Sequence, residues 1–154
     1  MRTSVDVHNF LLERDVPHEL VPVRGRFRSP DRVAAVLGLA PEQVGKVLVY
    51  GGSKGPVAVL IPSDREADLR RVAVAVPTPT LAELGPDEVA DATDYLAEAV
   101  PPVGLPGGVR VVMDRRLTEQ DVLYFAGGET RTVLKIRPED LRRAADAKVA
   151  RVTK

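Results

Sequence analysis

Two apolar runs joined by a short glycine-rich segment constrain the fold of this chain more than any other feature. KVLVY (46–50) is followed by GGSKG (51–55) and then by PVAVLI (56–61). This spacing predicts a β-hairpin, in which the glycines form the turn and the two runs pair as antiparallel strands. KVLVY is apolar at successive positions after Lys46, which is typical of a strand that is covered on both faces. The chain therefore needs further elements on each side of this hairpin.

Helices and additional strands follow in no regular alternation. Ser29 and Pro30 predict the start of a helix that ends at Gly38, since serine caps helix N-termini and proline suits the first helical position. Other helices are expected from Thr3 or Ser4 to about Arg14, within 63–76 with Ser63 as its cap, within 85–96, and over 138–150. Further strands are expected at 18–23, 108–114, 121–128 and 132–138. Hairpins mixed with helices predict an α+β domain.

Composition narrows the class of protein. With 154 residues, 44% of them hydrophobic and 29% charged, the chain is expected to form one globular domain over residues 1–154. It contains no cysteine, which excludes disulfides, zinc–thiolate sites and cysteine nucleophiles. No apolar run is long enough for a membrane span and no secretory signal is evident, so we expect a cytoplasmic protein without membrane contact. His8 and His18 lack metal-ligand spacing, and no phosphate-loop or dinucleotide motif occurs, so we expect no metal and no cofactor.

Charge is segregated along the chain although the formal net charge is +0. Arg24, Arg26, Arg28 and Arg32 form a basic cluster that could contact phosphates. Between Arg71 and Arg110 there is no lysine or arginine, and acidic residues accumulate. A solvated surface is the more common explanation of such charge runs.

Two local features suggest a binding site. Lys46 begins the most apolar predicted strand, where an ammonium could hold a phosphate or carboxylate, although a lysine at a strand end more often extends to solvent. PPVGLP (101–106) is a stiff loop that could present backbone groups to a small polar ligand, although a simple connector is the more common case. Asp114 ends the next strand and is expected to accept backbone N–H groups of the following turn.

In chain order these segments resemble the YbaK/ProX family of aminoacyl-tRNA deacylases, which is also found as an editing domain in some bacterial prolyl-tRNA synthetases. The resemblance covers nearly the whole chain and depends on the order and spacing of its segments. They are SPDRVAAVLGL (29–39), VGKVLVY (44–50), PVAVLIPSD (56–64), ADLRRVA (67–73), LAELGPDEVADATDY (81–95), PPVGLP (101–106), VVMD (111–114), DVLYFAGG (121–128) and LKIRPEDL (134–141).

The resemblance implies a compact α+β domain in which helices flank a strongly curved, barrel-like mixed β-sheet. It also implies hydrolysis of the ester that links a wrong, small amino acid to tRNA, commonly proline tRNA. No acid–base triad is implied, because a ribose hydroxyl of the tRNA assists the reaction. Lys46 would hold the terminal adenosine and phosphate, and the backbone of Ala99, Pro102 and Gly104 would cradle the amino-acid carbonyl.

The segment from Thr93 to Pro102 departs from the family pattern, which is roughly T-G-Y-x-x-G-G-x-S-P. Thr93, Tyr95 and Pro102 match, whereas Asp94, Glu98 and Ala99 replace glycines. Glycine permits a positive φ or a close approach of backbone to ligand, so these substitutions bear on the carbonyl cradle.

The leading hypothesis is a deacylase that edits mischarged tRNA, with the acceptor end of tRNA as its partner and a synthetase as a second candidate partner. Arg24, Arg26 and Arg28 would contact the acceptor stem. Tyr95, Glu98 and Asp114 are further candidate substrate-binding residues, and Glu98 could bind the α-ammonium group or act as a base for water. The alternative is a non-catalytic module that binds tRNA, a nucleotide or a synthetase and has lost the glycine loop. Hydrolysis of a small ester or nucleotide conjugate is a weaker third option.

Overall fold

The computed structural model describes residues 1–24 and 29–154. Its larger sheet contains the predicted hairpin, in which β2 and β3 pair antiparallel with Lys46 opposite Ile61. Gly52 and Gly55 exchange backbone hydrogen bonds of 3.2 and 3.1 Å in the turn. β5 and β8 extend the sheet in parallel from β3, so the sheet is mixed, as predicted. In spatial order the strands are β4 (Leu81–Glu83), β2 (Gly45–Gly52), β3 (Val57–Pro62), β5 (Arg110–Asp114) and β8 (Lys148–Ala150).

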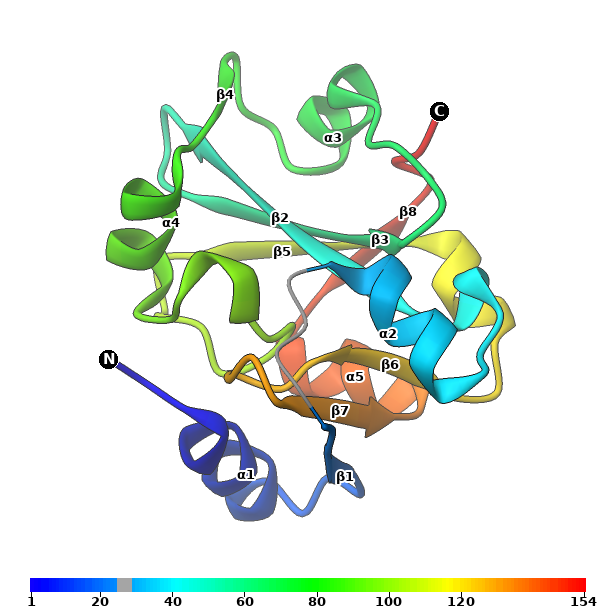
Figure 1. Ribbon diagram of the computed structural model, residues 1–154. Helices are drawn as coiled ribbons and strands as arrows, with labels where there is room; N and C mark the ends of the chain where they lie inside the picture. Colours follow the sequence, from blue (N-terminus) through cyan, green and yellow to red (C-terminus); the bar gives the residue numbers. More distant parts are fainter. Residues whose placement is uncertain (25–28) are drawn as a thin grey trace.

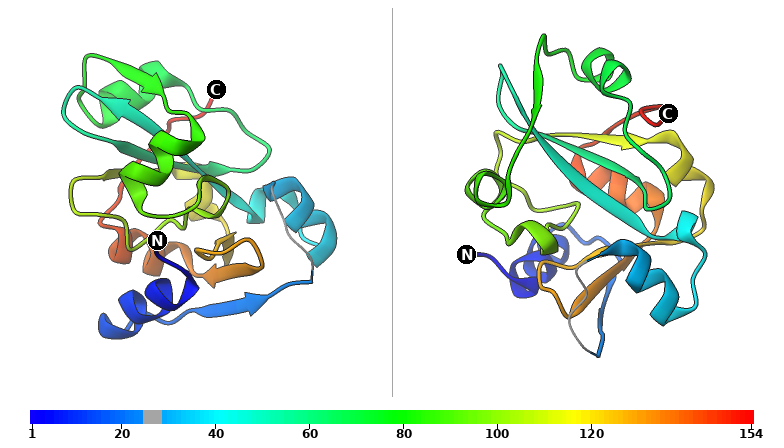
Figure 2. Two further views of the ribbon diagram at one scale, coloured as in Figure 1. Left: turned by 60° about the vertical axis from the view of Figure 1, so that its left-hand side comes forward. Right: turned by 45° about the horizontal axis from the view of Figure 1, so that its top comes forward.

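A second, antiparallel sheet consists of β1 (Glu19–Pro22), β7 (Thr132–Ile136) and β6 (Leu123–Ala126), in that spatial order. It lies below the five-stranded sheet in Figure 1, and Figure 2 shows the same two layers from other sides. A single bridge between Val44 and Tyr124 connects the two sheets. Closure into a barrel requires continuous pairing between neighbouring strands. The expected barrel-like single sheet is therefore corrected to two sheets, with no closed barrel in the described part of the chain.

Except for the helix predicted after Ser63, the helices begin where capping residues and prolines predicted. The Thr3 hydroxyl accepts a hydrogen bond from the Val5 N–H at 3.3 Å, and Ser29 accepts one from the Arg32 N–H at 3.4 Å. The α-helices are α1 (Ser4–Glu13), α2 (Pro30–Leu37), α3 (Leu69–Ala75), α4 (Pro86–Thr93) and α5 (Pro138–Ala145). Short 3₁₀ helices are η1 (Pro41–Gln43), η2 (Ala97–Ala99) and η3 (Arg115–Glu119).

Two predicted helix boundaries are wrong. Ser63 does not cap α3: its hydroxyl donates to the Pro41 carbonyl at 2.9 Å, and the helix is capped by Asp68, which accepts from the Arg70 N–H at 3.1 Å. The last helix does not continue to residue 150. It ends before Asp146, which adopts a left-handed conformation with φ of 49°, and residues 148–150 then form β8.

The core has two layers, separated by the five-stranded sheet. All six residues of β3 are buried, and they alternate between the layers. Leu60 packs with α1, α5 and the three-stranded sheet, whereas Val59 and Ile61 pack with Val72 of α3. Coverage on both faces was predicted for residues 46–50 of β2, where Val49 and Tyr50 are buried and Lys46 to Leu48 are only half-buried, whereas β3 is the strand that is buried throughout. Among the described residues, no helix has the length and apolar character that crossing a membrane requires.

Candidate functional site

A cavity of about 210 Å³ lies between β2, η2, α2 and the turn that joins β6 to β7. Lys46 of β2 and Glu98 of η2 both line it, so the structure brings together two residues that are 52 positions apart. Its walls are mainly apolar, with a few polar groups from the turn. The other lining residues are Ser29, Pro30, Val33, Val44, Gly45, Val47, Leu48, Ala97, Val100, Phe125, Ala126, Glu129, Thr130, Thr132 and Val133.

Lys46 lies beside a wall that forms because its neighbour is a glycine. A methyl group at Gly45 would lie 2.6 Å from Cε2 of Phe125 and closer still to Cζ and Cε1. The Phe125 ring therefore occupies the space of the missing side chain, and it is only 2% exposed. Lys46 itself is half-buried, and no ion pair with another described residue is recorded for it. A half-buried ammonium in an apolar wall is suited to bind an anion.

The segment after α4 is folded by its own side chains and brings Glu98 to the cavity. The buried Thr93 hydroxyl donates to the Val89 carbonyl at 2.8 Å and accepts from the Tyr95 N–H at 3.2 Å. The Ala99 N–H then donates to the Leu96 carbonyl at 2.9 Å, which closes the η2 turn. These bonds fix the direction in which the segment enters the cavity wall.

Asp94 replaces a family glycine and still adopts a glycine-like conformation. Its φ is 63°, and it forms the left-handed C-cap of α4. Aspartate tolerates this region better than most residues. The N-terminal segment secures it, because the Arg2 N–H donates to the Asp94 carbonyl at 2.8 Å and Arg2 Nε lies 3.3 Å from Asp94 Oδ2. Among the described non-glycine residues, positive φ occurs only at three aspartates, so neither Glu98 nor Ala99 needs glycine for its φ.

Tyr95 belongs to the core and not to the cavity wall. It is fully buried, and its hydroxyl has no hydrogen-bond partner in the described structure. Burial raises the pKa of the Tyr95 hydroxyl to about 12, and the nearby Asp6 carboxylate contributes to the increase. Its placement favours a structural role under the N-terminal helix.

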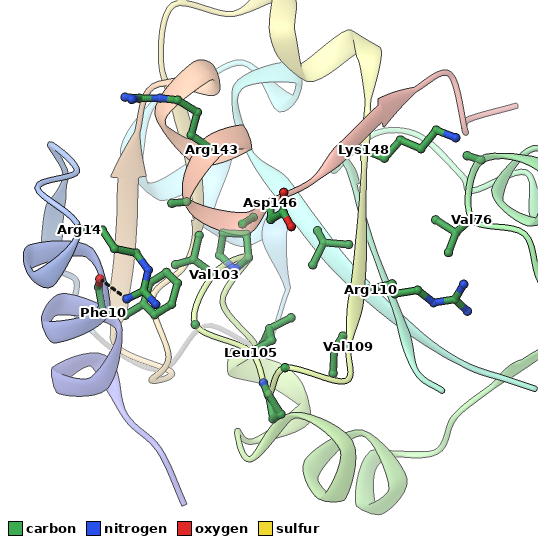
Figure 3. Close-up of a pocket in the computed structure, with 18 of the residues that line it drawn as sticks. Phe10, Arg14, Val76, Val103, Leu105, Val109, Arg110, Arg143, Asp146 and Lys148 are labelled. Carbon is green, nitrogen blue, oxygen red and sulfur yellow. Dashed lines mark hydrogen bonds between the residues drawn. The ribbon is translucent and has the colours of Figure 1, made fainter. Parts of the chain in front are cut away.

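The loop after η2 separates two cavities. Ala99 is fully buried, whereas Pro102 and Gly104 line a second cavity together with Phe10, Arg110 and Arg143 (Figure 3). The structure therefore places Glu98 with Lys46 but Pro102 and Gly104 elsewhere. Gly104 has a φ of 71°, and its carbonyl accepts a hydrogen bond from Arg2 Nη1 at 2.8 Å.

The remaining predicted substrate-binding residues lie outside the cavity lining. Asp114 is fully buried and accepts from the N–H groups of Arg116 at 3.2 Å and Val152 at 2.9 Å. Its predicted anchoring of the following turn is confirmed, and it also holds the C-terminal segment. Arg24 is exposed and lines none of the described cavities. Arg26 and Arg28 lie outside the described residues.

Several lining residues were not predicted from the sequence. Glu129 and Thr132 come from the β6–β7 turn, where Thr132 Oγ1 donates to Glu129 Oε2 at 3.4 Å. The sequence signal that could have revealed Glu129 is an acidic residue directly after the Gly127–Gly128 pair.

The two histidines, predicted to be structural or on the surface, contact one another, with His8 Nδ1 3.0 Å from His18 Nε2. Within residues 1–24 and 29–154, no group of three or more potential metal ligands is found.

Comparisons with known proteins identify the family and the fold of this chain. EbsC of Enterococcus faecalis, named for a proposed Cys-tRNA(Pro)/Cys-tRNA(Cys) deacylase activity, is 24% identical over 126 residues, which are 81% of this chain and 77% of EbsC. The crystal structure of a proposed trans-editing enzyme for prolyl-tRNA synthetase is 26% identical with a TM-score of 0.90, and the match covers 100% of this chain and 98% of that one. The hypothetical protein APE2540 is 28% identical with a TM-score of 0.91, over 97% and 99% of the two chains. A family model described as an aminoacyl-tRNA editing domain matches residues 26–144, so the chain belongs to the aminoacyl-tRNA editing domain family.

Proposed function

We propose that this protein is a trans-editing deacylase, which hydrolyses the ester of a small amino acid mischarged on proline tRNA. The observation that carries the proposal is the position of Lys46 and Glu98 on the wall of one small cavity, in a chain of the editing family. An aminoacyl-tRNA end carries an anionic phosphate and a cationic α-ammonium group close to the ester. The cavity lining carries one basic side chain, Lys46, and two acidic ones, Glu98 and Glu129, so it offers charges complementary to both groups.

Lys46 contacts the phosphate of the terminal nucleotide. Its stem lies in the sheet wall, so the ammonium reaches the cavity from a rigid strand and not from a loop. A charge-assisted hydrogen bond of this kind contributes about 1.5–3 kcal/mol. Lys46 therefore positions the ester and does not act as a nucleophile.

Glu98 binds the α-ammonium group of the esterified amino acid. It enters the cavity from η2, whereas Lys46 enters from β2, so the two charges approach the ligand from different elements. This role assigns a function to a residue where family members usually have glycine. An N-blocked aminoacyl ester would lose this contact.

Hydrolysis proceeds without an acid–base triad. Water adds to the ester carbonyl, the bond from the carbonyl carbon to the ribose oxygen breaks, and the products are the free amino acid and the tRNA hydroxyl. The adjacent ribose hydroxyl relays the proton from the water to the departing oxygen. Val100 lines the cavity, and a backbone N–H donor of this segment would stabilise the developing oxyanion; one such donor supplies on the order of 3 kcal/mol.

Cavity size limits the amino acid. About 210 Å³ is below the roughly 300–1,000 Å³ of typical small-molecule sites, and part of it must hold the ribose. A side chain the size of alanine or cysteine fits these limits. The deacylase activity named for EbsC concerns cysteine, which is consistent with this size class.

The test is deacylation of a panel of aminoacyl-tRNAs, with alanine, cysteine, proline and phenylalanine each on proline tRNA. Wild type should release the small amino acids, and Lys46→Ala should lower kcat/KM about 10- to 100-fold through the lost contact. Lys54→Ala is the matched control, because Lys54 is an exposed lysine of the same hairpin. Glu98→Gly should lower activity on free aminoacyl ends but not on N-acetylated ones. A wild type that hydrolyses none of the panel, but binds tRNA, would instead support the non-catalytic alternative.

A further inference from the structure

The second cavity is larger than the first and more basic. It measures about 750 Å³ and lies between α1, the loop at 102–109, β5 and the C-terminal end of α5 (Figure 3). Residues 97, 98 and 100 line the first cavity and residues 102–107 line the second. Two residues of extended chain span about 7 Å, so the two cavities approach one another closely across this loop.

Four cationic residues from different elements line this cavity, together with one carboxylate. They are Arg14 after α1, Arg110 of β5, Arg143 of α5 and Lys148 of β8, and the acidic residue is Asp146. The lining thus carries a formal charge of 4 − 1 = +3, in a chain whose formal net charge is +0. Such a local excess of positive charge raises the concentration of anions near the cavity.

Two of these cations are not neutralised by a neighbouring acid. Arg143 pairs with Asp140 at 2.8 Å, and Arg14 lies 4.0 Å from Glu13. These two acidic residues do not line the cavity. No ion pair within the described chain is recorded for Arg110 or Lys148.

Arg110 has donors that the described part of the protein does not satisfy. Its Nε and Nη2 are buried without a hydrogen-bond partner, and Nη1 makes only a long bond of 3.4 Å to the Pro77 carbonyl. A guanidinium with few protein acceptors gains more from a nearby anion than one that is already paired.

The lining of the cavity also includes apolar and aromatic side chains, which are called its apolar floor below. Phe10, Val103, Leu105 and Val109 contribute to it, and the Arg14 guanidinium lies 3.6 Å from the centre of the Phe10 ring. A guanidinium held over an aromatic ring can also stack with a planar group. Cations beside an apolar surface match a nucleotide, which combines a phosphate with a base.

We propose that this cavity binds a nucleotide unit of the tRNA, at a position other than the 3′ end held by Lys46. Arg110 and Lys148 contact its phosphate, and the base or sugar lies against the apolar floor. The choice of tRNA as the partner rests on the proposed function, whereas the anion site itself rests on the geometry of the cavity. The second site would add affinity for the tRNA body without touching the ester.

The experiment compares two double variants that remove the same charges. Arg110→Gln/Lys148→Gln removes two cavity cations, and Arg70→Gln/Lys54→Gln removes one exposed arginine and one exposed lysine that line none of the described cavities. Binding of unacylated proline tRNA is measured by fluorescence anisotropy between about 50 and 200 mM salt. The cavity variant should bind roughly tenfold more weakly, and its plot of log affinity against log salt should be less steep by about 2. The control should differ little from wild type.

Additional measurements separate folding, the site and the proposed function. Lys148→Gln alone, at an exposed position, should reduce the salt slope by about 1 even if the Arg110 variant unfolds. In parallel, AMP is titrated while backbone amide resonances of residues 103–109 are followed, and they should shift in wild type and not in the cavity variant. Equal tRNA binding by both double variants, beside an active wild-type deacylase, overturns this site but leaves the proposed function intact. Arg110-dependent tRNA binding by a protein that deacylates nothing supports the site and rejects the proposed function.

Discussion

Gly45→Ala tests whether the wall of the Lys46 cavity depends on contact between a glycine and an aromatic ring. The added methyl group would lie within 2.6 Å of Phe125 Cε2 and closer to two other ring atoms. Phe125 is 2% exposed, so the ring cannot simply swing into solvent. The substitution must displace either β6, which carries Phe125, or β2, which carries Lys46.

The expected cost comes from overpacking. Forcing one methyl group into a well-packed core costs about 1–3 kcal/mol, and the rigid ring places this case in the upper part of that range. Phe125→Leu alone should cost about 1–2 kcal/mol, because it removes buried apolar volume. In the double variant the smaller side chain makes room for the methyl group, so the total cost should be at least about 1 kcal/mol less than the sum of the single costs.

Urea unfolding of the four proteins gives the cycle, and the deacylation rate of each reports the state of the cavity. Gly107→Ala is the matched control, since no atom lies within 4 Å of the corresponding methyl position. It should leave stability within about 0.5 kcal/mol of wild type. Additive costs in the cycle, or a Gly45→Ala protein as stable as the control, would refute the packing argument.

Three other perturbations follow from single side chains. Asp94→Ala should lower the stability by about 1–2 kcal/mol, because residue 94 has a φ of 63° that alanine adopts only with strain. Asp94→Gly should keep most of the wild-type stability, because glycine adopts this φ freely. Thermal unfolding measures both variants, and equal losses of stability would contradict a backbone origin. Asp114→Ala should lower the free energy of unfolding by about 3 kcal/mol, because buried donors including the Val152 N–H lose their acceptor. Urea unfolding measures this cost. A cost below about 1 kcal/mol would show that water replaces the carboxylate. The pKa of Tyr95 is raised from about 10 to about 12, so its contribution to stability is complete below pH 10 and is lost as pH rises from 10 to 12. Wild type should lose roughly 3 kcal/mol relative to Tyr95→Phe over that interval, and parallel pH profiles of the two proteins would exclude this effect.

The local elements of the fold could be predicted because their signals are short-range. The hairpin at 46–61 follows from two apolar runs and a glycine turn, and the start of α2 follows from Ser29 and Pro30. The final strand could not be predicted, because KVA (148–150) is too short to show a period and pairs only through the non-local edge of β5. The break before it depends on the left-handed conformation of Asp146, which aspartate permits but does not require.

Only some residues of the candidate site could be predicted from the sequence. Lys46 stood out by its place at the start of an apolar strand, and the structure places it on the lining of a cavity. The separation of Glu98 from Pro102 and Gly104 could not be foreseen, because the spacing along a loop does not reveal which side each residue faces. The turn with Glu129 was missed for the same reason, since it reaches the cavity only through pairing of β6 with β7.

The three departures from the family glycines now separate into different kinds. Asp94 retains the left-handed conformation that a glycine would have there, and Arg2 holds it in place, so the backbone is preserved. Ala99 is fully buried in the η2 turn and faces neither cavity. Of these three residues, only Glu98 adds a charge to the cavity wall that also carries Lys46. A carboxylate at this position weakens binding of a purely anionic ligand, because like charges repel. We therefore infer that the cavity selects a ligand bearing both charges, which an aminoacylated 3′ end has and a free nucleotide lacks.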